Sequence, residues 1–221
     1  MLIEQNLEKV YRSIPKGVDL IAVSKTKPVS DIQEAYDYGQ RKFGENRVQE
    51  MVNKYEVLPK DIEWHMIGHL QRNKVKYMAH FVHMIHGVDS FEKLAEINKQ
   101  AKKHDRIIDC LLQVKIAQEE TKFGLSFVEV SDILQSEEVK SLENVKIRGL
   151  MAMASFTSDE KQINDEFKDL KAFFDLLNSK YALELDCLSI GMSGDYEIAI
   201  NNGSTMIRIG SSIFGNRNYI A

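Results

Sequence analysis

Lys25 stands where the first apolar segment of the sequence ends. Leu20 to Val23 are four consecutive apolar residues, too few for a helix and typical of a parallel strand that is buried on both faces. A lysine in this place is commonly a surface charge. An amine held half desolvated over a pocket instead loses its proton more readily and attacks carbonyl carbons, which is how Schiff-base lysines arise. Lys25 is therefore a candidate for covalent chemistry with an aldehyde.

Two segments near the end of the sequence combine glycine and serine and could bind an anion. Residues 191–196 contain Ser193, and residues 210–215 contain Gly210 and Ser211. Small residues let backbone N–H groups approach an anion, and hydroxyl groups add further donors. Both segments could equally be ordinary turns, so their place in the fold decides between the two interpretations.

Arg208 lies inside an apolar segment, where a buried charge needs a partner. An aldehyde-bearing phosphate ester would use all of these groups: Lys25 for the aldehyde, the two small-residue segments for the phosphate, and Arg208 between them. Pyridoxal 5'-phosphate (PLP) is such a molecule. A phosphosugar on a Schiff-base aldolase would use similar groups, and the residues alone leave both ligands open.

Eight short apolar segments alternate with segments of helical spacing, after a helix predicted over Leu2 to Ile14. The alternation predicts an α/β fold of parallel strands with right-handed crossovers. We predict a closed (β/α)8 barrel of the TIM type, formed by one domain over residues 1–221, because closure leaves no sheet edge. The alternative, an open doubly wound sheet, usually has a glycine-rich turn after its first strand, and residues 24–27 contain no glycine. The predicted strands are 20–23, 42–44, 62–67, 81–88, 107–114, 145–153, 185–190 and 205–209.

Closure of this barrel would bring the candidate residues together. The last strand becomes the neighbour of the first, and active sites of such barrels lie at the carboxyl ends of the strands, often with phosphate bound after strands seven and eight. Among the connections, we expect helices with capping boxes at Ser30 with Gln33 and at Ser126 with Glu129, and a helix over residues 74–79.

The composition limits the function classes. The chain has 221 residues, 43% of them hydrophobic, and a formal net charge of -4, which argues against nucleic acid or an anionic membrane as partner. No apolar segment has the length of a membrane span and the polar start is unlike a signal peptide, so the expected location is the cytoplasm. Cys110 and Cys187 fall in apolar segments and are expected to be core residues.

The histidine spacing does not predict a metal site. His65 and His69 are four residues apart, which suits a metal only on a helix, but His65 falls in a predicted strand and Gly68 lies between them. His83 and His86 are three apart on another predicted strand and should face opposite sides. We therefore expect no metal.

Seven ordered blocks of the sequence resemble one family, the YggS-type pyridoxal phosphate homeostasis proteins, also called proline synthase co-transcribed homologues. The resemblance spans nearly the whole chain, and it implies the barrel of the alanine racemase N-terminal domain type (PLP fold type III). The blocks are residues 22–27, 43–50, 64–71, 121–125, 148–154, 191–197 and 203–210.

The resemblance also implies which residues would surround PLP. The implied contacts are Lys25 to the aldehyde as a Schiff base, Ser193, Gly210 and Ser211 to the phosphate, Arg208 to the pyridine nitrogen, and Asn46 near the ring.

Arg208 favours a carrier over a catalyst. A guanidinium does not release its proton, so it cannot fully protonate the pyridine nitrogen, and the ring becomes a poorer electron sink. Racemases of the related fold take a second base from an extra domain, for which this chain is expected to have no room. We therefore expect a PLP-binding homeostasis protein without catalytic residues, monomeric, with amino acids and PLP-dependent apoenzymes as further candidate partners. The alternative is a PLP-dependent amino-acid racemase or a related enzyme.

Overall fold

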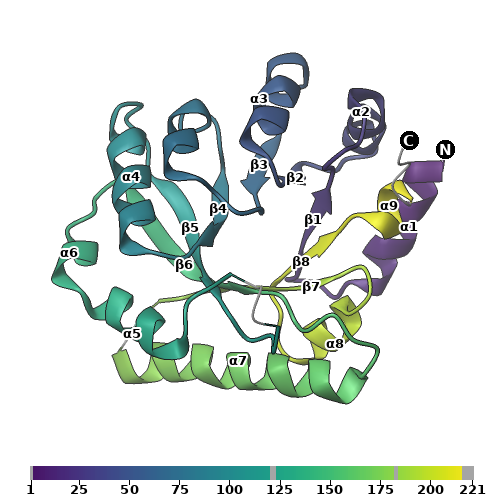
Figure 1. Cartoon of the computed structure of the whole chain (residues 1–221). Helices are drawn as coiled ribbons and strands as arrows, with labels where there is room; N and C mark the ends of the chain where they lie inside the picture. Colours follow the sequence, from purple (N-terminus) through teal and green to yellow (C-terminus); the bar gives the residue numbers. More distant parts are fainter. Residues whose placement is uncertain (1, 120–122, 182–183, 216–221) are drawn as a thin grey trace.

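The computed structural model describes residues 2–119, 123–181 and 184–215, and within them eight parallel strands form a closed barrel (Figure 1). Consecutive strands pair in chain order, and β8 pairs with β1 to close the sheet. The predicted barrel is confirmed, and the open sheet is excluded. The strands are β1 (Asp19–Val23), β2 (Lys42–Glu45), β3 (Glu63–Met66), β4 (Met84–Val88), β5 (Ile108–Val114), β6 (Val145–Ala152), β7 (Cys187–Met192) and β8 (Met206–Ile209).

Helices surround the strands, with α7 along one side of the barrel and α1 beside α9 (Figure 1). The Asn6 side-chain amide joins α1 to α9 by donating to the Ile213 carbonyl at 2.9 Å. In the part of the chain that the structure describes, no helix is both long and apolar enough to cross a membrane. The helices are α1 (Leu2–Ser13), α2 (Val29–Asp37), α3 (Val48–Val57), the 3-10 helix η1 (Arg72–Tyr77), α4 (Phe91–Lys102), α5 (Phe127–Gln135), α6 (Glu137–Lys140), α7 (Glu160–Tyr181), α8 (Tyr196–Asn201) and α9 (Ser211–Phe214).

Alternate side chains of a strand pack in two layers, because successive residues point to opposite faces. On β1, Leu20 and Ala22 belong to the large core between sheet and helices, whereas Ile21 belongs to a smaller cluster inside the barrel. Cys187 lies in that inner cluster and Cys110 in the outer core. Both are free and buried as predicted, and burial raises the pKa of the Cys187 thiol to about 12.

Of the two predicted capping boxes, the structure contains one. The capping box of Ser126 and Glu129 is present at the start of α5. The capping box at Ser30 is wrong, because α2 begins already at Val29, directly after Pro28. Ser30 therefore lies inside the first turn, and its hydroxyl contacts Asp31 instead.

Other differences concern short elements. The helix predicted over residues 74–79 is the 3-10 helix η1, which begins earlier, at Arg72. β4 begins only at Met84, and β7 continues to Met192, into the segment predicted as a loop. The one-turn helices α6 and α9 were not predicted, because four residues are too few to establish a helical period.

Candidate functional site

A cavity of about 750 Å3 opens at the carboxyl ends of the strands, where barrels of this type place their active sites. All six residues singled out in the sequence line it. They come from the loops after β1 and β2, the segment that follows β7, β8 itself and the segment that follows β8. These residues are Lys25, Asn46, Ser193, Arg208, Gly210 and Ser211.

A buried ion pair fixes the backbone on the amino side of Lys25. Lys54 of α3 pairs with Glu45 at the end of β2, with 2.7 Å between Nζ and Oε1. The Lys54 ammonium also donates to the Ser24 carbonyl at 2.8 Å, and the Ser24 hydroxyl donates to Glu45 Oε1 at 2.6 Å. Ser24, Glu45 and Lys54 are all buried. Ser24, the residue before Lys25, is therefore held through both its backbone carbonyl and its side chain.

The same network reaches the carboxyl side of Lys25. The Thr26 backbone N–H donates to Glu50 Oε1 at 2.6 Å, and Glu50 pairs with Lys54 at 2.7 Å. Thr26 has φ of 64°, a left-handed conformation that is unusual for a β-branched residue. With the backbone fixed on both sides, the half-buried Lys25 side chain lies in the cavity wall.

Sequence reasoning missed this network, although one signal was available. Lys54 follows Val48 and Met51 at three-residue spacing on the buried face of α3, and a lysine at a core position calls for a partner. The partner is Glu45, whose pKa burial raises to about 7 against the opposing attraction of Lys54.

Lys27 has a different position from Lys25. Its ammonium donates to the carbonyl oxygens of Phe214 at 2.8 Å and Gly215 at 3.2 Å. These carbonyls lie at and just beyond the end of α9, so Lys27 ties the loop after β1 to the segment after β8. The tie holds together the two parts of the cavity wall that closure of the barrel makes neighbours.

Arg208 is buried inside the barrel and reaches the cavity from below. Its Nη1 donates to the carbonyl and to the hydroxyl of Ser189, both at 2.7 Å, and its Nη2 donates to the Ala152 carbonyl at 2.9 Å. These three acceptors are neutral oxygen atoms. Burial lowers the pKa of Arg208 to about 10, so the guanidinium keeps its charge at neutral pH.

The two glycine- and serine-containing segments meet in the cavity wall. The Gly210 backbone N–H donates to Ser193 Oγ at 3.3 Å. A Cβ added to Gly210 would lie 3.2 Å from the Val23 carbonyl oxygen, so this segment packs tightly against β1. At the start of the other segment, Gly191 has φ of 95°, and an added Cβ would lie 2.7 Å from the Ala199 side chain. A side chain at position 191 would therefore be strained and would clash, whereas one at position 210 would need a shift of a few tenths of an ångström.

The opposite wall contains residues that the sequence did not single out for the site. His69 stacks on Phe123 with 4.6 Å between the ring centroids. The Gln113 side-chain amide donates to the Phe123 carbonyl at 3.0 Å, and all three residues line the cavity. Phe123 belongs to the fourth sequence block, whose residues 121 and 122 lie outside the described residues.

Comparisons with known proteins place this barrel and its cavity in a class. Residues 2–218 match the model of the alanine racemase N-terminal domain. A curated protein of Aquifex aeolicus named pyridoxal phosphate homeostasis protein is 41% identical over 201 residues, covering 90% of this chain and 87% of the relative. A protein of the same name from Vibrio alginolyticus is 38% identical and covers 98% of both chains.

A solved structure agrees with these relatives. PipY of Synechococcus elongatus, solved with PLP bound, is 35% identical with a TM-score of 0.87, over 96% of this chain and 100% of that chain. The class is thus the alanine racemase N-terminal domain barrel. Within it, the chain belongs to the family of pyridoxal phosphate homeostasis proteins.

Proposed function

We propose that this protein binds PLP in the cavity at the carboxyl ends of the strands, holds it on Lys25 as a Schiff base, and serves vitamin B6 homeostasis. The observation that carries the proposal is that Lys25 and residues 210–211 follow neighbouring strands, β1 and β8, and line one cavity. The name of the curated relatives and the PLP bound to PipY support the same ligand.

The residues of the cavity fit this ligand. The tight packing of Gly210 on β1 leaves the wall there without a side chain, and Ser193 and Ser211 offer hydroxyl groups beside it. We assign the phosphate to these three residues and the neighbourhood of the ring to Asn46. When bound, PLP supplies an aldehyde that reacts with amines and a ring that can accept electrons from an attached amino acid.

Arg208 supports a carrier rather than a catalyst. We place its guanidinium at the pyridine nitrogen, where it can donate a hydrogen bond but keeps its proton. Its bonds to Ser189 and Ala152 fix it in this charged form. A ring nitrogen without a full proton is a weaker electron sink, so we propose that the site holds the cofactor and that no residue of this chain acts as a catalytic residue.

The experiment that tests PLP binding uses the two neighbouring lysines. The purified protein should be yellow, and borohydride reduction followed by peptide mapping should place a pyridoxyl phosphate group on Lys25. Lys25→Ala should abolish the label, whereas Lys27→Ala, the matched control, should keep it because Lys27 is bonded to the end of α9. A colourless protein that stays unlabelled with added PLP would refute the proposal and favour a phosphosugar ligand.

A PLP-dependent amino-acid racemase is the second candidate, favoured by the match to the alanine racemase N-terminal domain. Exchange of the α-proton of amino acids with deuterated water distinguishes the two functions. Exchange above the rate of free PLP that is lost in Lys25→Ala would establish the enzyme. Exchange no faster than with free PLP agrees with the carrier.

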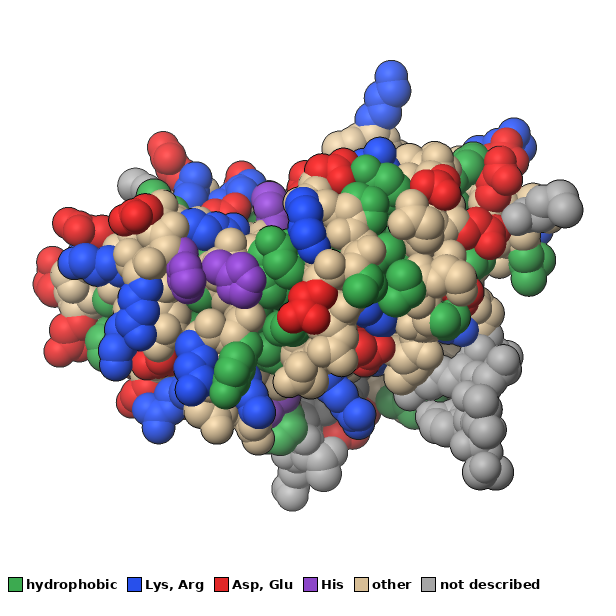
Figure 2. Space-filling model, turned by 90° about the horizontal axis from the view of Figure 1, so that it is seen from above, with side chains coloured by type: hydrophobic (Ala, Val, Ile, Leu, Met, Phe, Trp, Pro, Cys, Tyr) green, Lys and Arg blue, Asp and Glu red, His purple; other side chains and the backbone are tan. Residues whose placement is uncertain are grey.

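The partners and the state of assembly stay predictions from the sequence. Amino acids and PLP-dependent apoenzymes are the expected partners besides PLP, and the expected form is a cytoplasmic monomer. Acidic and basic side chains are interspersed over the face shown in Figure 2. Sedimentation of the purified protein checks the monomer.

A further inference from the structure

A second, smaller cavity lies at the opposite mouth of the barrel, where the strands begin. Its volume is about 230 Å3, and its wall includes the first residues of β1, β2, β4, β7 and β8. His65 and His83 also line it. Neither histidine belongs to the site described above.

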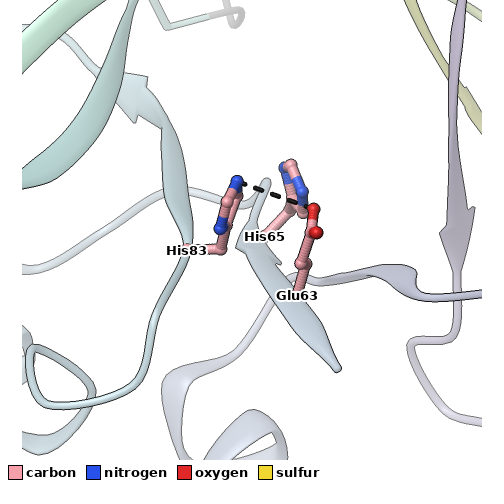
Figure 3. A group of neighbouring side chains, drawn as sticks. All are labelled: Glu63, His65 and His83. Carbon is pink, nitrogen blue, oxygen red and sulfur yellow. Dashed lines mark ion pairs between the residues drawn. The ribbon is translucent and has the colours of Figure 1, made fainter. Parts of the chain in front are cut away.

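Three side chains converge at this mouth. Glu63 and His65 are two residues apart on β3 and therefore point to the same side of the strand, and His83 lies just before β4. One ligand atom of each lies within 4.8 Å of the other two, and His83 Nε2 is 3.6 Å from Glu63 Oε2. Figure 3 shows the three side chains pointing toward one another.

The structure corrects the expected direction of His83 and His86. They do not face opposite sides: the His83 ring centroid lies 5.3 Å and the His86 centroid 5.2 Å from that of His65. The alternation of a strand does not apply, because β4 begins only after His83. His65 lies on β3 and His83 just before β4, so spacing within one segment could not show that the two meet.

His65 has a nitrogen that calls for a partner. Its side chain is 1% exposed, and among the described residues Nε2 has no hydrogen-bond partner. Burial, reinforced by His86, His83 and Lys42, lowers the pKa of His65 well below its ordinary value. Histidine binds metal ions through such an unprotonated ring nitrogen.

The other charges at this mouth are paired among themselves. Lys42 pairs with Asp19 at 2.6 Å, and Arg148 pairs with Asp186 at 2.5 Å. Each cation in the cavity wall thus has a carboxylate of its own. Among the described residues, the ion-pair partner of the Glu63 carboxylate is His83.

We propose that Glu63, His65 and His83 bind a divalent transition metal ion of the zinc class at the amino-terminal mouth of the barrel. Two imidazoles and one carboxylate are a common ligand set for zinc, with a fourth position open to water. Ligand atoms about 2.0 Å from a tetrahedral ion lie about 3.3 Å apart. The 3.6 Å between Glu63 Oε2 and His83 Nε2 is close to this spacing, and the two side chains are 38% and 43% exposed.

The far side of His65 is built to support a bound ion. His65 Nδ1 lies 2.9 Å from His86 Nε2, and His86 Nδ1 lies 3.2 Å from Ser189 Oγ. A metal ion on Nε2 requires the His65 proton on Nδ1, where it donates to His86. The His86 proton then lies on Nδ1 and is donated to Ser189. A histidine ligand that donates its second nitrogen to a fixed acceptor is typical of metal sites.

This chain of hydrogen bonds leads through the barrel to the first cavity. Ser189 Oγ also accepts from Arg208, and a hydroxyl oxygen has two lone pairs for two such donors. A metal ion on His65 would therefore fix the positions of the ring protons of His65 and His86. The chain of hydrogen bonds continues through Ser189 to the Arg208 guanidinium beside the large cavity.

Metal titration of the chelator-treated, dialysed full-length protein tests the proposal. Zn2+ should bind with one ion per chain in calorimetry, and Co2+ in its place should show the visible absorption bands of a four- or five-coordinate site. His83→Ala and Glu63→Gln should each weaken binding at least about ten-fold. The control His104→Ala removes a surface histidine elsewhere and should bind as tightly as the unchanged protein.

The outcomes separate this proposal from the proposed function. Metal binding is measured without amino acids and without added PLP, so its outcome does not depend on whether the protein binds PLP. Far-UV circular dichroism shows whether each variant is folded, and Glu63→Gln changes no volume. An unchanged protein that binds no ion, or folded His83→Ala and Glu63→Gln variants that both bind as tightly as it does, would refute the site.

Discussion

The two mouths of the barrel are built in different ways. At the carboxyl ends, a cavity of about 750 Å3 has walls of loop residues, among them glycine and serine. At the amino ends, a cavity of about 230 Å3 is lined by the first residues of strands, and half-buried ion pairs such as Lys42 with Asp19 lie in its wall. The loops thus enclose a cavity about three times as large as the one between the strand starts.

The charged groups near each mouth also differ in burial. Beside the large cavity, Lys54 and Glu45 are 6% and 0% exposed, and they fix the backbone on which Lys25 stands. At the small cavity, Lys42 and Asp19 are 30% and 49% exposed. A buried pair binds its surroundings tightly and is costly to break, whereas an exposed pair contributes little. The ligand cavity thus depends on a charge network beneath it that contains no proposed ligand contact.

Removal of one partner from each pair should give the largest contrast. At about pH 8, Lys54→Met should lower the free energy of unfolding by about 3 kcal/mol, because it leaves the Glu45 carboxylate buried without its cation. Lys42→Met removes a partner of the more exposed pair and should cost less than about 1 kcal/mol. Urea unfolding of both variants measures the difference. Equal losses would mean that the buried network does not hold this end of the barrel.

The same comparison shows what the sequence could predict. The barrel and the cofactor cavity depend on apolar segments, on small residues and on residues next to strand ends such as Lys25, and each of these is visible along the chain. The ion pair of Glu45 with Lys54 and the meeting of His65 with His83 join different elements. Such contacts depend on strand register and helix rotation, which no local spacing encodes.

The buried pair should also make stability depend on pH. The pKa of Glu45 is raised from 4.5 to about 7, so the folded protein binds more protons than the unfolded chain between these values. Its contribution is fully present below about pH 4.5 and is lost as the pH rises through about 7, which should lower the free energy of unfolding by about 3 kcal/mol. Urea unfolding at about pH 5 and about pH 8 measures this.

Glu45→Gln isolates the effect of that one carboxyl group. The variant keeps the shape of the side chain but does not titrate, so its stability should fall less over the same pH range than that of the unchanged protein. Identical pH profiles, or a steeper fall in the variant, would show that Lys54 holds Glu45 ionised and that the raised pKa is wrong.

The smallest effect is expected from a methyl group placed in the wall of the large cavity. In Gly210→Ala the new Cβ would lie 3.2 Å from the Val23 carbonyl oxygen and 3.3 Å from the Val23 Cβ, so the segment after β8 must shift away from β1. In Gly194→Ala, the matched control in the same wall, the new Cβ meets nothing within 4 Å. A shift of a few tenths of an ångström at a phosphate contact should cost about 1 kcal/mol of binding, the size of one hydrogen bond, or about five-fold in the PLP dissociation constant. Absorbance titration of both variants with PLP measures it, and equal affinities would remove Gly210 from the proposed phosphate contacts.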